Sequence, residues 1–239
     1  MTAKIHVRSE VILFSIVLLT AAAQSQPGKD FLAHHQGTPF HDGKYHDGPQ
    51  KVPGTVMCAY YDLGGEGVAY DDSDAKNNGS GALNPANGSY LNEFRMNEGV
   101  DTSYTKFDLD PKIDDNPYNK VVPPSRLLYI GWTAPGEWLN LTVDVADTSD
   151  YSIDLLYTSN RGGTISLEVN GEHSTGALKI ASTYDAAEPV AWRQWHHWNV
   201  AHNLAQVHME KGRNVITLRT LTEGQMNYAT LRFTPIHHP

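Results

Sequence analysis

The chain has 239 residues and a formal net charge of -9 at pH 7. Its composition, 40% hydrophobic and 10% aromatic, is that of a folded rather than a disordered protein. The negative charge argues against a nucleic-acid partner, because proteins that bind nucleic acid carry a basic stripe. A single cysteine, Cys58, excludes an internal disulfide framework, and its apolar surroundings indicate a small buried hydrophobe.

The N-terminal segment has the layout of a secretory signal peptide. A mildly basic start precedes a continuous apolar run from Val11 to Ala23, and small residues up to Ser25 form a cleavage pattern. The run is shorter than the roughly 20 residues that a membrane-spanning helix needs, although an uncleaved anchor is the alternative. We therefore predict that residues 1–25 are removed, and that the mature protein is extracellular or periplasmic and makes no membrane contact.

Residues 26–52 are rich in Gly, Pro, His and Asp and show no apolar period. This texture predicts an irregular leader or linker. Four histidines lie in it, and a metal-binding cluster is one interpretation of them. Their spacing matches no standard site, which favours a solvated loop; the histidines are His34, His35, His41 and His46.

The remaining residues, 53–235, have the length of one domain. Thr55–Asp62 is an apolar and aromatic run of strand length. Two long polar regions follow at 71–98 and 101–124, dominated by Asp, Asn, Gly and Ser. Loops of this length in a compact domain are usually functional or held by a metal.

The second half of the chain alternates apolar and polar residues with a period of two. The clearest cases are Leu139–Val145, Tyr151–Tyr157 and Thr164–Val169, and Asn170-Gly171 then favours a tight hairpin turn. Strands buried on one face need a second sheet to cover that face. The fold class predicted is therefore an all-β antiparallel sandwich of the jelly-roll type, without a long amphipathic helix. Further strands are expected at Leu178–Ser182, Gln194–Val200, Leu204–Met209, Asn214–Thr220 and Tyr228–Phe233.

An ordered series of short motifs runs through residues 52–234. It consists of Val52-Pro53-Gly54-Thr55-Val56, Gly64-Gly65-Glu66-Gly67-Val68-Ala69-Tyr70-Asp71, Phe94-Arg95, Gly131-Trp132-Thr133, Gly136-Glu137-Trp138, the pair Trp192 and Trp195, and Met226-Asn227-Tyr228. Each motif is weak by itself, but independent matches rarely fall in the right order. The series resembles the family 6 carbohydrate-binding modules, which are related to families 35 and 36.

This resemblance implies a galactose-binding-like β-sandwich that binds sugar in a cleft formed by loops at one edge. Trp132 and Trp192 fall on the two aromatic positions that grip a sugar ring in the family. Glu66 falls on an acidic position used for hydroxyl contacts, and Gln225 replaces the usual Asn. The implied function is a secreted, non-catalytic module that binds a polysaccharide or oligosaccharide, alone or as an accessory subunit of a partner glycoside hydrolase.

Tryptophan suits this role because its flat apolar body stacks on the C–H face of a pyranose ring while its N–H meets polar groups. Trp132 and Trp192 adjoin turns, which favours ligand contact. Trp138 and Trp195 are interpreted as packing residues, and Trp198 is left open between the two roles.

Members of the family often bind a structural calcium through carboxylates of the first strand. Met57 and Ala59 occupy those positions here, and neither can coordinate a hard cation. A calcium site elsewhere has four candidates in the following acidic loop, for which a merely solvated loop is the alternative. The candidates are Asp108, Asp110, Asp114 and Asp115.

Catalysis is the competing functional interpretation. A glycoside hydrolase needs paired carboxyl groups, for which Glu66, Glu98, Asp101 and Glu137 are available. A lyase would use His196-His197, but neighbours on a strand point to opposite faces. The chain has no G-x-S-x-G, H-E-x-x-H or phosphate-binding loop. The sequence therefore favours binding without catalysis, and no catalytic residue is assigned.

Overall fold

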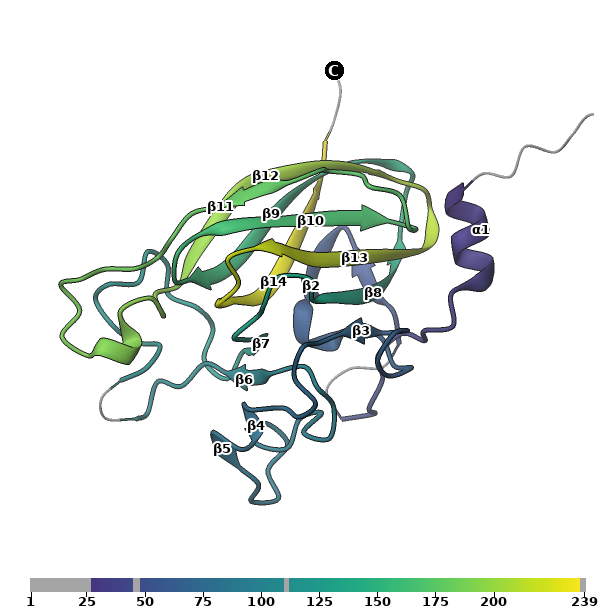
Figure 1. Ribbon diagram of the computed structural model, residues 1–239. Helices are drawn as coiled ribbons and strands as arrows, with labels where there is room; N and C mark the ends of the chain where they lie inside the picture. The colour runs from purple at the N-terminus through teal and green to yellow at the C-terminus, as the bar shows by residue number, and fades with distance from the viewer. Residues whose placement is uncertain (1–26, 45–47, 110–111, 237–239) are drawn as a thin grey trace, which may run out of the picture.

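A computed structural model describes residues 27–44, 48–109 and 112–236 of the chain. The predicted signal peptide, residues 1–25, lies outside the described residues. Two six-stranded sheets pack face to face (Figure 1), so the predicted all-β sandwich is confirmed. Among the helices of the described residues, none is both long and apolar enough to cross a membrane.

The first sheet has the strand order β1-β8-β13-β10-β11, with β3 paired to β8 on the side. All its pairs are antiparallel except β1 with β8, which run parallel in the register Gln50↔Val143. The strands are β1 (Gln50–Val52), β3 (Tyr70–Asp71), β8 (Trp138–Val145), β10 (Gly163–Val169), β11 (Leu178–Ile180) and β13 (Gly212–Thr222).

The second sheet has the order β12-β9-β14-β7-β6, with β2 paired to β14, and all its pairs are antiparallel. Its strands are β2 (Gly54–Met57), β6 (Thr102–Tyr104), β7 (Leu128–Ile130), β9 (Ser149–Ser159), β12 (Asn199–Met209) and β14 (Met226–Pro235). A separate two-stranded parallel pair, β4 (Ser80–Gly81) and β5 (Asn84–Pro85), lies in the long polar region.

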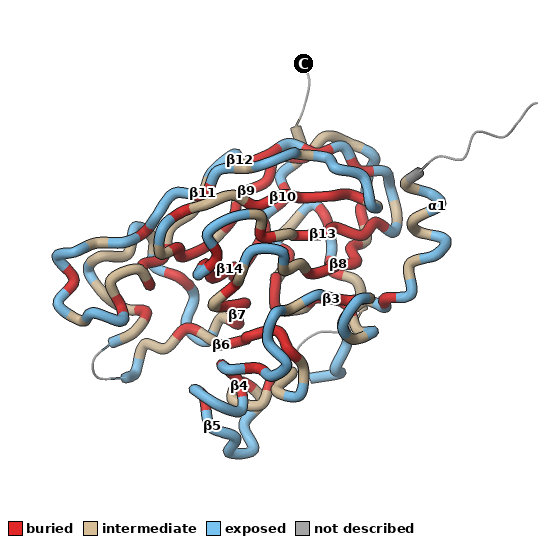
Figure 2. The backbone as a smooth tube through the Cα atoms, in the orientation of Figure 1, coloured by how far each residue is buried: buried red, intermediate tan, exposed pale blue. Residues whose placement is uncertain are grey.

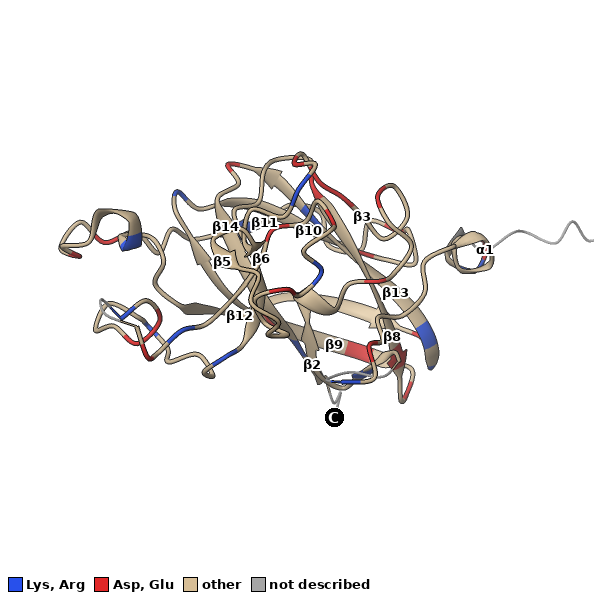
Figure 3. Cartoon of the chain, turned by 90° about the horizontal axis from the view of Figure 1, so that it is seen from below, with Lys and Arg blue, Asp and Glu red and all other residues tan. Residues whose placement is uncertain are grey.

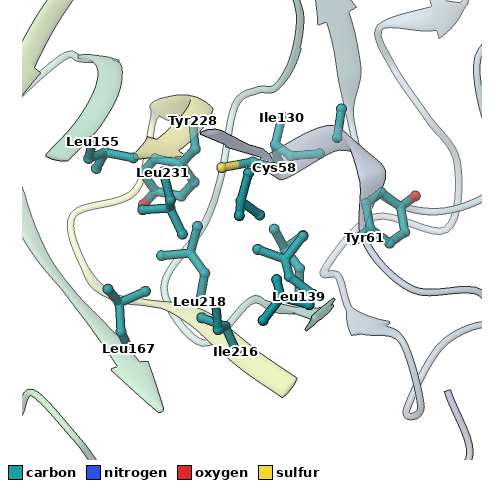
Figure 4. Close-up of a cluster of buried hydrophobic side chains, with 14 of the residues drawn as sticks. Cys58, Tyr61, Ile130, Leu139, Leu155, Leu167, Ile216, Leu218, Tyr228 and Leu231 are labelled. Carbon is teal, nitrogen blue, oxygen red and sulfur yellow. The ribbon is translucent and has the colours of Figure 1, made fainter. Parts of the chain in front are cut away.

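The core forms between the two sheets from the alternating residues of their strands. In β9 the buried residues Tyr151, Ile153, Leu155 and Tyr157 alternate with partly exposed ones, as the period of two predicts. Leucines from both sheets meet around Cys58 (Figure 4), which is fully buried. Each fully buried leucine contributes roughly 1.5–3 kcal/mol to folding. Burial also raises the pKa of the Cys58 thiol well above its ordinary value.

Strand β8 is buried on both faces, unlike the simple alternation expected for it. On the face away from the core, Thr142 donates to Asp62 Oδ2 at 2.7 Å, and Asn140 donates to the Val68 carbonyl at 2.9 Å. The segment that follows β2 therefore covers this face and supplies partners for its polar side chains.

The predicted hairpin turn at Asn170-Gly171 is confirmed. Both residues have positive φ, 53° and 74°, which a two-residue type I′ turn requires. The flanking residues exchange two backbone hydrogen bonds of 3.0 Å, between Val169 and Glu172. A Cβ at residue 171 would lie 2.5 Å from the ring of Phe31, so this position requires glycine for space as well as for φ.

The prediction of an irregular segment over residues 26–52 is wrong, because it contains β1 and the helix α1 (Pro27–His34). An eight-residue helix is marginal by itself and is held by tertiary contacts. Phe31 packs on the hairpin turn, Gly28 N donates to Glu172 Oε1 at 3.1 Å, and His35 Nε2 lies 2.9 Å from Asp62 Oδ2.

The histidines of this segment make separate contacts. His34 and His41 bond to backbone carbonyls of Asp30 and Pro39, whereas His46 lies outside the described residues. These bonds are local, within four residues along the chain, so they tie each imidazole to its own turn.

The strand predicted for Gln194–Val200 is also wrong over most of its length. A 3-10 turn, η2 (Ala191–Arg193), and irregular chain occupy this region, and β12 begins only at Asn199. Similarly, the first predicted strand ends at Met57 and continues as η1 (Cys58–Tyr60). The long loops lie at one end of the sandwich and contain buried segments among exposed ones (Figure 2).

Candidate functional site

The loops at this end of the sandwich surround an open pocket of about 820 Å³. Its walls come from the regions of β5 and β6, the connections after β7 and β9, the loop carrying η2, and the turn before β14. The lining is largely aromatic and apolar, with amide, hydroxyl and amino groups between. It consists of Leu83, Asn84, Ser103, Lys106, Leu109, Ile113, Tyr129, Trp132, Asn160, Trp192, Trp195, His196 and Gln225.

Three of the four predicted ligand-binding residues meet in this pocket: Trp132, Trp192 and Gln225. Trp132 lies two residues after the end of β7 and has a φ of 50°, a left-handed conformation that tryptophan rarely adopts. Its backbone N–H donates to Asn227 Oδ1 at 3.1 Å, which fixes this turn. Gln225 also has a positive φ, and its Oε1 accepts a hydrogen bond from Asn160 Nδ2 at 2.6 Å.

Trp192 and Trp195 lie three residues apart on the turn that contains η2. Trp192 belongs to η2 and Trp195 lies two residues after its end, and both line the pocket. Trp192 is 55% exposed and Trp195 is half-buried. The prediction that Trp195 is a core residue is therefore wrong, since it assumed a strand in this region. Trp198, which the sequence left open, is fully buried beside Tyr129.

A buried ion pair holds the loop that carries these two tryptophans. Arg193 donates from Nε to Glu188 Oε2 at 2.9 Å and from Nη2 to Glu188 Oε1 at 2.8 Å. Burial pushes the pKa of Glu188 upward, but the bonds from Arg193 outweigh it and leave that pKa below its ordinary value. Burial lowers the pKa of His197, whose Nδ1 donates to the Thr183 carbonyl at 3.0 Å. The loop is therefore held from within by a buried ion pair.

A second loop, residues 106–121, is fastened to the first. Tyr118 donates its hydroxyl to the Ala187 carbonyl at 2.7 Å, and its ring stacks on His197 with centroids 5.3 Å apart. Arg193 Nη1 donates to the Lys112 carbonyl. Figure 1 shows the two loops, one green and one teal, side by side at one end of the sandwich. These contacts join two of the loops that line the pocket.

Beneath the pocket, the buried carboxylate of Asp114 organises the surrounding groups. Its Oδ1 accepts from His196 Nε2 at 2.9 Å and from Trp198 Nε1 at 2.6 Å, and its Oδ2 accepts from the backbone N of Lys106 at 2.5 Å. His196 Nδ1 accepts from the amide of Asn227 at 3.0 Å, so the N–H that His196 donates to Asp114 is on Nε2. The same Asn227 holds Trp132, so the network joins two walls of the pocket.

The described carboxylates of the acidic loop do not point to a common centre. Both oxygens of Asp114 already accept hydrogen bonds, and Asp115 pairs with Lys112 at 2.6 Å. Asp108 is exposed, and Asp110 lies outside the described residues. Within the part of the chain that the structure describes, no three His, Cys, Asp or Glu side chains are grouped to hold a metal ion. The described residues of this loop therefore do not fit a calcium ion, which prefers six to eight oxygen ligands.

Glu66, the fourth predicted ligand-binding residue, does not line the pocket. It is exposed in the turn before β3, where it forms a bridge with Tyr70. Glu137, a candidate for hydrolysis, accepts bonds from Ser73 Oγ at 2.5 Å and from Ala134 N at 2.7 Å. Of the two candidates for lyase chemistry, His197 is fully buried, whereas His196 lines the pocket. The pocket is therefore separate from Glu66, Glu137 and His197.

A smaller hollow of about 430 Å³ lies between α1 and the outer face of the first sheet. Trp138 lines it, as expected for a tryptophan packed on a sheet face. The guanidinium of Arg219 lies 5.7 Å from the centre of the Trp138 ring, a cation–π contact. With one tryptophan rather than three, this hollow offers less aromatic surface than the larger pocket.

Sequence reasoning missed several lining residues, among them Asn160, Lys106 and Tyr129. Strand pairing was the available signal for Asn160. It follows β9 directly and Gln225 directly precedes β14, and these strands are neighbours in the register Met226↔Ser159. Lys106 and Tyr129 carry no comparable signal in the sequence. Lys106 lies in irregular chain, where no strand pairing predicts its position.

The chain matches no family model and no curated protein. Three solved structures to which it is similar are all carbohydrate-binding modules. The first, a family 35 module from Clostridium thermocellum, is 17% identical with a TM-score of 0.38, covering 49% of this chain and 84% of that one. A family 6 module from Clostridium stercorarium in complex with cellobiose is 11% identical with a TM-score of 0.46, covering 79% and 98%.

The third is a β-1,3-glucan-binding family 6 module from Bacillus halodurans, 14% identical with a TM-score of 0.43, covering 77% of this chain and 98% of that one. At these identities the similarity is one of fold.

Proposed function

We propose that the protein binds polysaccharide chains in the tryptophan-lined pocket and does not cut them. The observation that carries this proposal is the meeting of Trp132, Trp192 and Trp195 with the amides of Asn160 and Gln225 at one open pocket. Flat indole faces remove the C–H face of a sugar ring from water, and amides donate to and accept from its hydroxyl groups.

The exposed area of Trp192 sets the scale of the interaction. A tryptophan buries at most about 250 Å², and Trp192 is 55% exposed, so roughly 100 Å² of its ring is open to a ligand. Covering that area contributes about 2–3 kcal/mol. With a second ring and a few hydrogen bonds, and after ordering costs, the affinity expected is about micromolar to millimolar.

The chemistry of the lining supports binding rather than hydrolysis. Hydrolysis of a glycosidic bond needs two carboxyl groups on either side of the bond. Among the described lining residues there is no Asp or Glu, and Asp114 lies beneath the pocket with both oxygens occupied. From the predicted signal peptide we further propose that the protein binds polysaccharide outside the cell, alone or beside a partner glycoside hydrolase.

The test is affinity electrophoresis against a panel of soluble polysaccharides with the variants Trp192→Ala and Trp132→Ala. Loss of about 2–3 kcal/mol predicts affinity at least about thirtyfold weaker, and so no retardation in the gel. Trp138→Ala, at the smaller hollow, is the matched control and retains wild-type retardation. Thermal melts confirm that each variant is folded.

Unchanged retardation of both pocket variants would contradict the proposal. Reducing-end or unsaturated products, released by the wild type and lost in Glu137→Gln or Glu66→Gln, would favour catalysis instead.

A further inference from the structure

The pocket has a charged group that stacking on tryptophan does not use. Among the described lining residues, Lys106 is the only Lys, Arg, Asp or Glu. It lies two residues after the end of β6, and its side chain is half-buried. Its backbone N–H is fixed by Asp114, which places the start of its side chain at the wall of the pocket.

The partners of the Lys106 ammonium group are neutral and distant. Its Nζ lies 3.3 Å from Ser103 Oγ and 3.4 Å from the Tyr104 carbonyl, at the long end of hydrogen-bond distances. It also lies 4.4 Å from the centre of the Tyr104 ring. No carboxylate of the described chain comes within 4.0 Å of this nitrogen, so no ion pair compensates its charge.

Burial also makes the charged form of Lys106 less favourable in free energy, because it removes the ammonium group from water. It lowers the pKa of Lys106, and the charge of Asp114 opposes the effect only in part. In the view of Figure 3, the basic residues are scattered among acidic ones, and the chain as a whole is acidic. A partly buried cation on a sugar-sized pocket in an acidic protein is best compensated by an anion that the ligand supplies.

We propose that the pocket recognises an acidic saccharide, one whose carboxylate or sulfate ester pairs with Lys106 while its ring stacks on the tryptophans. This inference rests on the proposed function and adds the class of ligand. An ammonium group is a compact point charge with rotatable donors, so it can pair with either anion. An incoming anion replaces the two long hydrogen bonds of Nζ with a shorter charge-assisted one.

The experiment compares glycans that share a backbone and differ only in charge. The probes are β-1,4-glucan and β-1,3-glucan oligosaccharides, each in neutral, C6-oxidised and C6-sulfated form, together with xylan and glucuronoxylan. Binding is measured by isothermal titration for the wild type, Lys106→Met and Lys106→Arg. Lys120→Met is the matched control, because Lys120 is exposed and lies outside the pocket lining.

The probes form one set for each backbone: β-1,4-glucan, β-1,3-glucan and xylan. In at least one set, we expect the wild type to bind the acidic form about tenfold more tightly than the neutral form, a difference in binding free energy of about 1.4 kcal/mol. Lys106→Met removes this preference, and Lys106→Arg and Lys120→Met retain it. Raising the salt from 0.05 to 0.5 M weakens the preference in the wild type. The oxidised and sulfated arms show which anion is preferred.

Binding of neutral forms as tightly as acidic ones in every set would overturn this inference and leave the proposed function standing. The same holds if Lys106→Met keeps the full preference. Absence of binding to every glycan would overturn both proposals.

Discussion

The Asp114 network allows a sharp test of how the pocket is supported. In the variant Asp114→Asn, the amide cannot accept from three donors, because His196, Trp198 and the Lys106 backbone all offer N–H groups. Each hydrogen bond to a charged acceptor contributes about 1.5–3 kcal/mol, and one bond is lost while the others weaken. We expect the free energy of unfolding to fall by about 3–5 kcal/mol.

For a domain of this size each kcal/mol shifts the melting temperature by about 2–4 °C, so the variant should melt about 6–20 °C lower. The assay is calorimetry, with and without chelator, at neutral pH. The adjacent variant Asp115→Asn is the matched control, because the Asp115 side chain is 44% exposed and pairs with an exposed lysine. Exposed ion pairs contribute little, so the control should melt within about 2 °C of wild type.

A shift for Asp114→Asn below about 3 °C, or equal shifts for both variants, would refute the reasoning from buried hydrogen bonds. A shift that appears only without chelator would instead assign Asp114 to a metal site.

Two further predictions concern buried titratable groups. Burial raises the pKa of Asp72 to about 7 and that of Asp101 to about 6. The protonated carboxyl groups therefore stabilise the folded state at low pH, and this contribution to the free energy of unfolding is lost as pH rises through 6–7. Asp72→Asn cannot ionise, so its melting temperature relative to wild type should be higher at pH 8 than at pH 5; equal differences at the two pH values would contradict this. The Cys58 thiol is fully buried with a raised pKa, so at pH 8 a thiol reagent should modify the folded protein at least about a hundredfold more slowly than the urea-unfolded one. Modification of the folded protein at the unfolded rate would place this thiol at the surface.

The sandwich was predictable because strands such as β9 follow one rule, the burial of every second residue. Tyr151–Tyr157 and the Asn170-Gly171 turn appear in the structure as the sequence predicts. Local rules failed where the partner is distant in the sequence. The helix α1 depends on Phe31 meeting a turn about 140 residues later. The apparent strand at Gln194–Val200 is instead held as turn and loop by the pair of Glu188 and Arg193.

The candidate site was predictable in part for the same reason. Trp132, Trp192 and Gln225 adjoin strand ends or turns, and the family resemblance places them at one edge. Glu66 was misplaced because the course of the loop around it has no periodic signal. Lys106 escaped notice because its importance lies in what surrounds its ammonium group, and no local pattern encodes that.

The pocket and the hydrophobic core use almost separate sets of residues. Of the described lining residues, only Tyr129 also belongs to a cluster of buried hydrophobic side chains, with Trp198 and Ala229. Exchanges at the exposed lining positions, such as Trp192 and Leu83, therefore leave the packing between the sheets intact. Ligand preference can diverge rapidly through these positions in descendants of such a protein while their thermal tolerance stays constant, whereas at the buried lining residues Tyr129 and His196 the two traits constrain each other.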